Sequence, residues 1–148
     1  MEYLYERAVK VTHATLWQAL TDPALINVHL RNGVKIFSDS PGEYRVSMKV
    51  SVGFMRPTVK ADVRLGEIRE TQGFDLSISG KAMGASVTGA GSVRLDAVAG
   101  ISEVTLFALS GSIETTGLLK KISDEKIHAA TTDFLKDYFS SLENAAGI

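Results

Sequence analysis

The chain contains no cysteine. Disulfide bonds, thiolate metal sites, iron–sulfur clusters and thiol catalysis are therefore excluded for its own residues. A chain without cysteine also fits a reducing compartment. The opening segment, Met1–Arg7, is too polar to form the apolar core of an export signal. We therefore expect a cytoplasmic protein.

Long hydrophobic runs and an excess of one charge are also missing. The longest apolar runs are only a few residues, so we expect no membrane-spanning segment and at most peripheral membrane contact. Sixteen Lys and Arg residues stand against seventeen Asp and Glu residues, spread along the chain, with a net charge of −1. This balance does not favour a nucleic-acid partner. The 148 residues, 45% of them hydrophobic, fit a single domain over 1–148.

Catalytic and cofactor motifs are scarce as well. His13, His29 and His128 are far apart and form no His-x-x-x-His pair, so no metal site is expected. There is no Gly-x-Ser-x-Gly nucleophile motif. The glycine-rich stretch 80–91 lies in a predicted hairpin and not before a helix, which makes it a poor phosphate loop. We therefore expect no catalytic residue, no metal and no cofactor.

What the chain does contain is alternation with a period of two. Apolar side chains from Tyr44 to Val52 alternate with Arg45, Ser47, Lys49 and Ser51, as in a strand with one apolar face. Further strands are predicted over 3–11, 34–37, 59–65, 74–78, 87–95 and 104–108, seven in all. Their short, turn-rich links favour antiparallel hairpins, because parallel crossovers would need a helix between each pair.

Helical patterns flank this run of strands. Thr12 is a plausible N-cap for a short helix, and Pro23 ends that helix or begins a second one that reaches residue 30. Residues 115–144 form the only long amphipathic pattern. Its apolar stripe changes face near Ser123, where we expect a break and a new N-cap.

This order of elements predicts a sheet that covers one long helix. A twisted sheet curls around such a helix. The helix is about 10 Å across and fills a wide, curved sheet only if the facing side chains are bulky. Here many inward candidates are small, namely Ala61, Ala85, Gly89, Gly91, Ala108 and Gly111. They could leave an apolar ligand cavity, typically about 300–1,000 Å³, or they could instead let the helix approach the sheet closely.

Three stretches resemble known families. Residues 11–23 resemble the opening signature of START-like (SRPBCC) proteins. Residues 79–95 look like the glycine-rich hairpin of the family named for the G subunit of carbon monoxide dehydrogenase, and residues 117–139 are similar to its last helix. The segment 31–33 departs from that family, because only the glycine of its usual Pro-Gly pair is present.

The resemblance implies an α+β helix-grip fold (START/Bet v 1-like). This fold is a seven-stranded curved antiparallel sheet around a long C-terminal helix, with two short helices between strands 1 and 2. It also implies an accessory role beside a molybdenum hydroxylase, the molybdenum-containing carbon monoxide dehydrogenase type of enzyme. A quinone- or lipid-like ligand would occupy the cavity, and the chain would not be the catalytic component.

The side chains expected to line the cavity are apolar residues of the sheet and the last helix: Met48, Val50, Val63, Ile78, Val87, Leu106, Phe134 and Tyr138. Phe54 and Met55 are expected at the cavity mouth or in a docking patch. Two alternatives stay open. One is a cavity enzyme of the aromatase/cyclase type, for which Tyr44 and Tyr138 are the best inward polar groups. The other is a protein-interaction or assembly module with a filled core and no ligand.

Overall fold

The computed structural model describes residues 1–30, 34–49, 56, 58–82 and 84–146. In chain order the elements are β1 (Glu2–Val9), α1 (His13–Thr21), α2 (Pro23–His29), β2 (Val34–Ser40), β3 (Glu43–Lys49), β4 (Thr58–Arg69), β5 (Gly73–Ala82), β6 (Ala85–Val98), β7 (Ile101–Thr116), the 3-10 helix η1 (Gly117–Lys121) and α3 (Asp124–Ala145).

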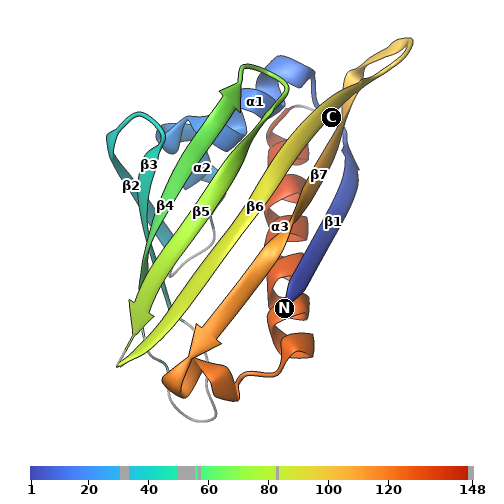
Figure 1. The fold of residues 1–148 in the computed structure, drawn as a ribbon. Coiled ribbons are helices and arrows are strands. Elements are labelled where there is room, and N and C mark those ends of the chain that lie inside the picture. The colour runs from blue at the N-terminus through green and yellow to red at the C-terminus, as the bar shows by residue number, and fades with distance from the viewer. Residues whose placement is uncertain (31–33, 50–55, 57, 83, 147–148) are drawn as a thin grey trace.

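The strands form one sheet in the order β1-β7-β6-β5-β4-β3-β2, and every neighbouring pair is antiparallel. Consecutive strands from β2 to β7 are simple hairpin neighbours, and β1 adds to the free edge of β7. The sheet wraps across α3, with α1 and α2 at one end and η1 at the other (Figure 1). The predicted helix-grip fold is confirmed.

The first and last α-helices, α1 and α3, begin at the predicted caps. The Thr12 hydroxyl oxygen accepts the backbone N–H of Thr15 at 3.3 Å, and Pro23 opens α2 behind the Asp22 cap. The Ser123 hydroxyl oxygen accepts the N–H of Lys126 at 3.2 Å, so the expected break separates η1 from α3. The helical part begins at Gly117 and not at residue 115, because β7 continues to Thr116.

The structure explains why glycines occupy facing positions in β6 and β7. Gly91 lies directly opposite Gly111 in the ladder. A Cβ atom on Gly111 would lie 2.4 Å from the carbonyl oxygen of Ala90 and 2.8 Å from the Cα atom of Gly91. Neither approach is sterically allowed, so the small residues here let two strands approach each other. What they admit is the neighbouring strand's backbone, and not the helix.

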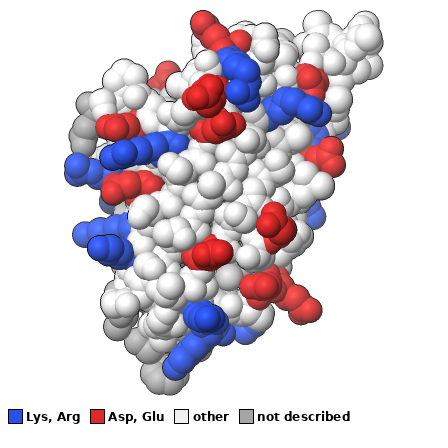
Figure 2. Space-filling model, in the orientation of Figure 1, with Lys and Arg blue, Asp and Glu red and all other residues white. Residues whose placement is uncertain are grey.

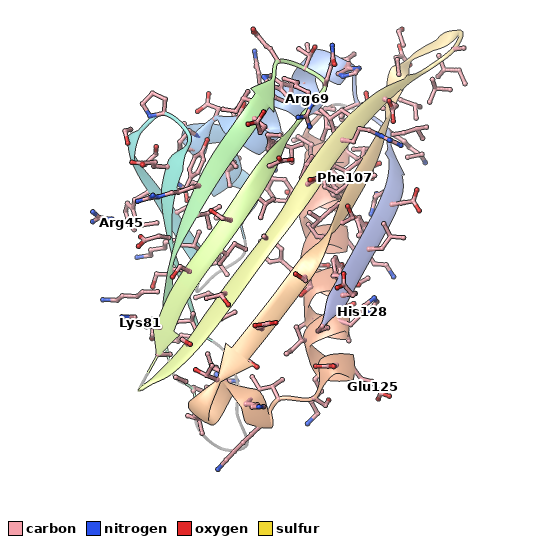
Figure 3. All side chains as sticks on the ribbon, viewed as in Figure 1. Arg45, Arg69, Lys81, Phe107, Glu125 and His128 are labelled. Atoms are coloured by element: carbon pink, nitrogen blue, oxygen red, sulfur yellow. The ribbon has the colours of Figure 1, made fainter. Side chains whose placement is uncertain are left out.

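The apolar core consists of two separate clusters. The main core lies at the α1 end of the sheet; its buried sheet and α3 members include Phe74, Val93, Leu95, Phe107, Tyr138, Phe139 and Leu142. Its centre is aromatic, since the rings of Phe107 and Phe139 lie 4.7 Å apart. Figure 3 labels Phe107 on β7, in front of α3. The smaller η1-end cluster contains Val59, Ala82, Ala85 and Leu119, with Val87, Leu118 and Ile122 packed against it.

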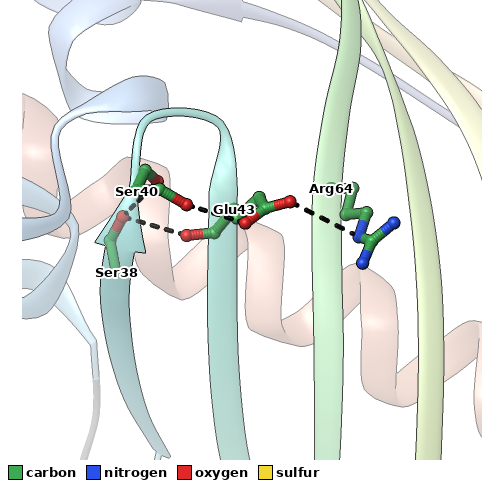
Figure 4. Close-up of polar contacts among 4 residues, drawn as sticks. All are labelled: Ser38, Ser40, Glu43 and Arg64. Carbon is green, nitrogen blue, oxygen red and sulfur yellow. Dashed lines mark hydrogen bonds and ion pairs between the residues drawn. The ribbon is translucent and has the colours of Figure 1, made fainter.

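The edge hairpin β2–β3 is held by a polar turn (Figure 4). The Ser38 hydroxyl donates to the carbonyls of Ser40 and Glu43, each at 2.9 Å. The Ser40 hydroxyl donates to a Glu43 carboxylate oxygen at 2.7 Å, and the other carboxylate oxygen lies 3.8 Å from Arg64 Nε on β4. Glu43 therefore joins the turn to the next strand.

Candidate functional site: the inner face between the two core clusters

Inner-face side chains change in burial along the strands. On β4, Val59 is buried, whereas Ala61 and Val63 on the same face are only partly buried. On β5, Phe74 is buried and Ile78 is partly buried. We call the partly buried inner-face residues between the two clusters the middle band; its sheet members are Val46, Met48, Ala61, Val63, Ile78, Gly89, Gly91, Gly111 and Ile113.

The covering helix shows the same change along its length. In α3 the buried residues are Tyr138, Phe139 and Leu142, all in the C-terminal half. Toward its start, Ile127, Thr131 and Phe134 are partly buried and complete the middle band. The main chain of α3 comes close to β1, an edge strand of the sheet, and to α2 (Figure 1). The helix is therefore firmly packed at one end of the inner face and less so over its middle.

The chemistry of the middle band is apolar. None of its described residues carries an ionisable side chain. Its hydroxyl group is that of Thr131, which donates to the carbonyl oxygen of Ile127 at 2.8 Å and keeps acceptor capacity. Such a surface can hold an uncharged apolar molecule, and its described residues offer no acid–base pair.

The structure brings together four of the predicted lining residues: Met48, Val63, Ile78 and Phe134 all lie in the middle band. Val87 packs instead against the η1-end cluster. Tyr138 is buried in the main core, with its hydroxyl donating to the Ala19 carbonyl oxygen at 2.5 Å. Val50, Phe54 and Met55 lie outside the described residues.

The placement of Leu106 is wrong. This side chain is 44% exposed, whereas its neighbours Thr105 and Phe107 are 0% and 3% exposed. The odd-numbered residues of β7 therefore face inward, so Leu106 and Ala108 point to the outer face. The prediction missed Ile113 and the partly buried Leu109 for the same reason. The aromatic bulk of Phe107 was the signal that could have set the register.

Two open depressions lie away from the middle band. One, of about 540 Å³, is lined by Met1, Glu2, Asp124, Glu125 and His128. The other, of about 430 Å³, lies where His13 meets the β6–β7 turn and the start of β7. Both are open to solvent, and the first is lined by three carboxylates, so neither fits the predicted apolar cavity.

The histidines are used in structural contacts. A ring nitrogen of His13 contacts the carbonyl oxygen of Thr71, and His29 Nδ1 lies 2.9 Å from the Ser141 hydroxyl. The His128 ring packs against Tyr3, with centroids 5.0 Å apart. Within the described part of the chain, no three His, Asp or Glu side chains are grouped as metal ligands would be. Among the described helices, none is long and apolar enough to cross a bilayer.

This geometry defines a class: a helix-grip protein of the START-like kind, with an apolar inner face under its last helix. The chain belongs to the CoxG family, that of the carbon monoxide dehydrogenase G subunit, whose model matches residues 6–147. No curated protein matches the chain.

Solved structures share the fold at low sequence identity. A conserved protein from Geobacillus kaustophilus has a TM-score of 0.84 and 16% identity, covering 98% of this chain and 94% of that one. The ZhuI aromatase/cyclase from a Streptomyces species has a TM-score of 0.60 and 14% identity, with coverage of 99% and 93%. Ara h 8.0201 has a TM-score of 0.63 and 20% identity, with coverage of 98% and 96%. At these identities the likeness shows the fold alone.

Proposed function

We propose that the protein is a non-catalytic binding protein that holds a hydrophobic small molecule in the middle band, between the sheet and α3. The observation that carries the proposal is the partial exposure of apolar inner-face side chains with buried ones at both ends. Side chains under a covering helix are normally close-packed. An apolar guest would therefore complete the packing that α3 leaves unfinished.

The energetic gain from such a guest is substantial. Removing about 200 Å² of apolar surface from water contributes about 5 kcal/mol at 25 cal/mol per Å². Part of this is lost to the entropy of immobilising the guest. The band has no ionisable side chain among its described residues, so the guest is uncharged where it lies in the band. A quinone- or lipid-like molecule meets that requirement.

The family suggests where such a molecule would be used. Its name associates it with carbon monoxide dehydrogenase, and we propose an accessory role in the cytoplasm beside a molybdenum-containing enzyme of that type. Such an accessory role requires only that the protein carry or store the apolar molecule. A tagged chain expressed in its own cells should co-purify with a molybdenum-containing complex. Recovery of the chain without molybdenum under gentle lysis would contradict the accessory role and leave ligand binding unaffected.

The second candidate is a cavity enzyme, which the ZhuI aromatase/cyclase neighbour brings into consideration. Two observations favour binding over catalysis. The described band residues include no acid or base, and the hydroxyls of Tyr44 and Tyr138 are already bonded to backbone carbonyls. A third reading, an interaction module with a filled core, would require the middle band to be close-packed in the free protein.

Native mass spectrometry tests ligand binding directly. Protein purified without detergent should carry an extra mass that is lost on unfolding and recovered by organic extraction. If no such mass is found, added decylubiquinone or oleate should bind with one-to-one stoichiometry. Absence of an endogenous guest together with absence of binding to both probes would contradict the proposal and favour the filled-core module.

A further inference from the structure

Basic side chains gather toward one end of the molecule although the net charge is only −1. Seven exposed Lys and Arg residues lie toward the η1 end, which we call the basic end: Lys35, Lys49, Arg56, Lys60, Lys81, Lys120 and Lys121. In the view of Figure 2 the lower extremity carries Lys and Arg, and most Asp and Glu lie above it or to the right. Figure 3 labels Lys81 on β5 toward that extremity.

The ladder places three of these lysines in one row across the outer face. Lys35 lies opposite Ser47, Ser47 opposite Lys60, and Lys60 opposite Lys81. With strands about 4.8 Å apart, the row extends over about 14 Å. Lys60 and Lys81 are a directly opposed like-charge pair, which destabilises a sheet. Fold stability therefore does not explain their presence.

These lysines have no acidic partner among the described residues. Ion pairs join Arg7 to Glu143, Arg64 to Glu43 and Arg94 to Asp96. The acids nearest to the basic end lie on its flanks: Asp62, one step up the outer face from Lys60, Glu114 on β7, and Asp124 and Glu125 in the first turn of α3. Charges nearer the other end of the sheet thus form ion pairs, whereas the described lysines of the basic end form none.

We propose that the basic end docks the protein on an anionic phospholipid surface. The lysines come from four strands and η1, so they present a broad end and not a groove that would follow a nucleic-acid strand. Six of the seven are lysines, whose point charges suit a diffuse anionic surface, whereas base readout favours the planar arginine fork. Each lysine near such a surface contributes about 1 kcal/mol.

A bilayer is also where an uncharged apolar guest would be collected. Only this statement about collecting the guest rests on the proposed function. The arrangement of the lysines does not depend on it. Docking by the basic end would orient the strands steeply to the membrane, with the α1 end directed toward the solvent.

Vesicle co-sedimentation of the full chain tests the proposal. Wild-type protein should bind phosphatidylcholine vesicles containing phosphatidylglycerol and not pure phosphatidylcholine vesicles, and binding should weaken as salt is raised. The double variant Lys60→Gln/Lys81→Gln should bind about 30-fold more weakly, from about 1 kcal/mol per lysine. The matched control is Lys10→Gln/Lys136→Gln, which has the same net charge as the test variant. Lys10 directly follows β1 and Lys136 lies on α3, so this control should bind like wild type.

Circular dichroism and thermal unfolding should show that both variants are folded, since removing an opposed like-charge pair does not harm the sheet. Equal binding to the two kinds of vesicle, or equal loss in the two variants, would overturn the proposal. The proposal would also be overturned if the protein bound an RNA oligonucleotide or polyglutamate but no vesicles, and if Lys60→Gln/Lys81→Gln lost that binding. Ligand binding is measured separately by mass spectrometry, so the two proposals fail independently.

Discussion

Tyr44 and Tyr138 donate hydroxyl hydrogen bonds to the last turn of the same short helix, α1. Tyr44, on β3, reaches the carbonyl oxygen of Thr21 at 2.6 Å, and Tyr138, on α3, reaches that of Ala19 at 2.5 Å. The last carbonyls of a helix have no partner within the helix. Two tyrosines from opposite sides of the fold satisfy them and fix α1 between the sheet and α3.

The first prediction is that these hydroxyls contribute stability. Tyr138→Phe leaves the Ala19 carbonyl without its partner in the main core, which should lower the free energy of unfolding by about 1–3 kcal/mol. Tyr44→Phe should cost less, because its hydroxyl lies nearer to the surface. Urea unfolding measures both. Wild-type stability for Tyr138→Phe would contradict the assignment, and unchanged ligand binding in both variants would agree with a structural role.

The second prediction concerns alkaline pH. Burial raises the pKa of Tyr138 above its ordinary value of 10.0, and burial followed by the charge of Asp22 raises that of Tyr44. Above pH 10 the unfolded chain therefore loses protons that the native chain keeps, so stability is complete below pH 10 and falls as pH rises. Urea midpoints from neutral to alkaline pH should decline above about pH 10, less steeply in Tyr138→Phe. A flat profile in the wild type would contradict this.

The third prediction concerns the clamp between β1 and α3. One carboxylate oxygen of Glu143 lies 2.5 Å from Arg7 Nη2, and the other accepts the backbone N–H of Lys10 at 2.8 Å. The Arg7 guanidinium also lies 5.9 Å from the ring centroid of Phe139. Glu143→Gln should cost about 1.5–3 kcal/mol, as expected for hydrogen bonds to a charged group.

The double variant Arg7→Met/Glu143→Gln provides the control for that clamp. The double variant should lose less free energy of unfolding than the two single variants lose together. Each single variant leaves one charge without its partner, whereas the double variant leaves none. Denaturant unfolding gives all the values needed for the cycle. Strict additivity would show that the pair is not coupled.

The fourth prediction concerns the glycine pair in β6 and β7. Gly111→Ala forces a Cβ atom against the backbone of β6, so the strands must separate, at a cost of about 1–3 kcal/mol. Gly66→Ala on β4 is the matched control, because its Cβ atom meets nothing within 4 Å and should be neutral or slightly stabilising. Thermal unfolding compares them. Equal midpoints would contradict the close approach of the two strands.

Much of the fold could be predicted because most of its apolar–polar patterns indicate a single structure. The alternation from Tyr44 onward has a polar opposite face, so only one register is sensible. In β7 both faces are apolar, since Val104, Leu106 and Ala108 alternate with Phe107 and Leu109. Periodicity cannot choose between two such faces, and the inward set was assigned to the wrong one. The hidden information was tertiary: which face meets the rings of α3.

The candidate site was less accessible to sequence reasoning for two physical reasons. Small residues were counted as empty space, although Gly91 and Gly111 admit a neighbouring strand. The basic end was invisible because Lys35, Lys60 and Lys81 come from different hairpins and are aligned only by the ladder. A charge count along the chain averages such an arrangement to nearly zero.

The most direct test of the central claim is to fill the middle band and measure binding. Ile78→Trp adds a large side chain to the band, whereas Leu106→Trp places the same side chain on the outer face of β7. Isothermal titration with decylubiquinone and with oleate should show binding at least about tenfold weaker for Ile78→Trp, or about 1.4 kcal/mol, and unchanged for Leu106→Trp. Full binding by a folded Ile78→Trp protein, or equal loss in both variants, would contradict a ligand in the middle band.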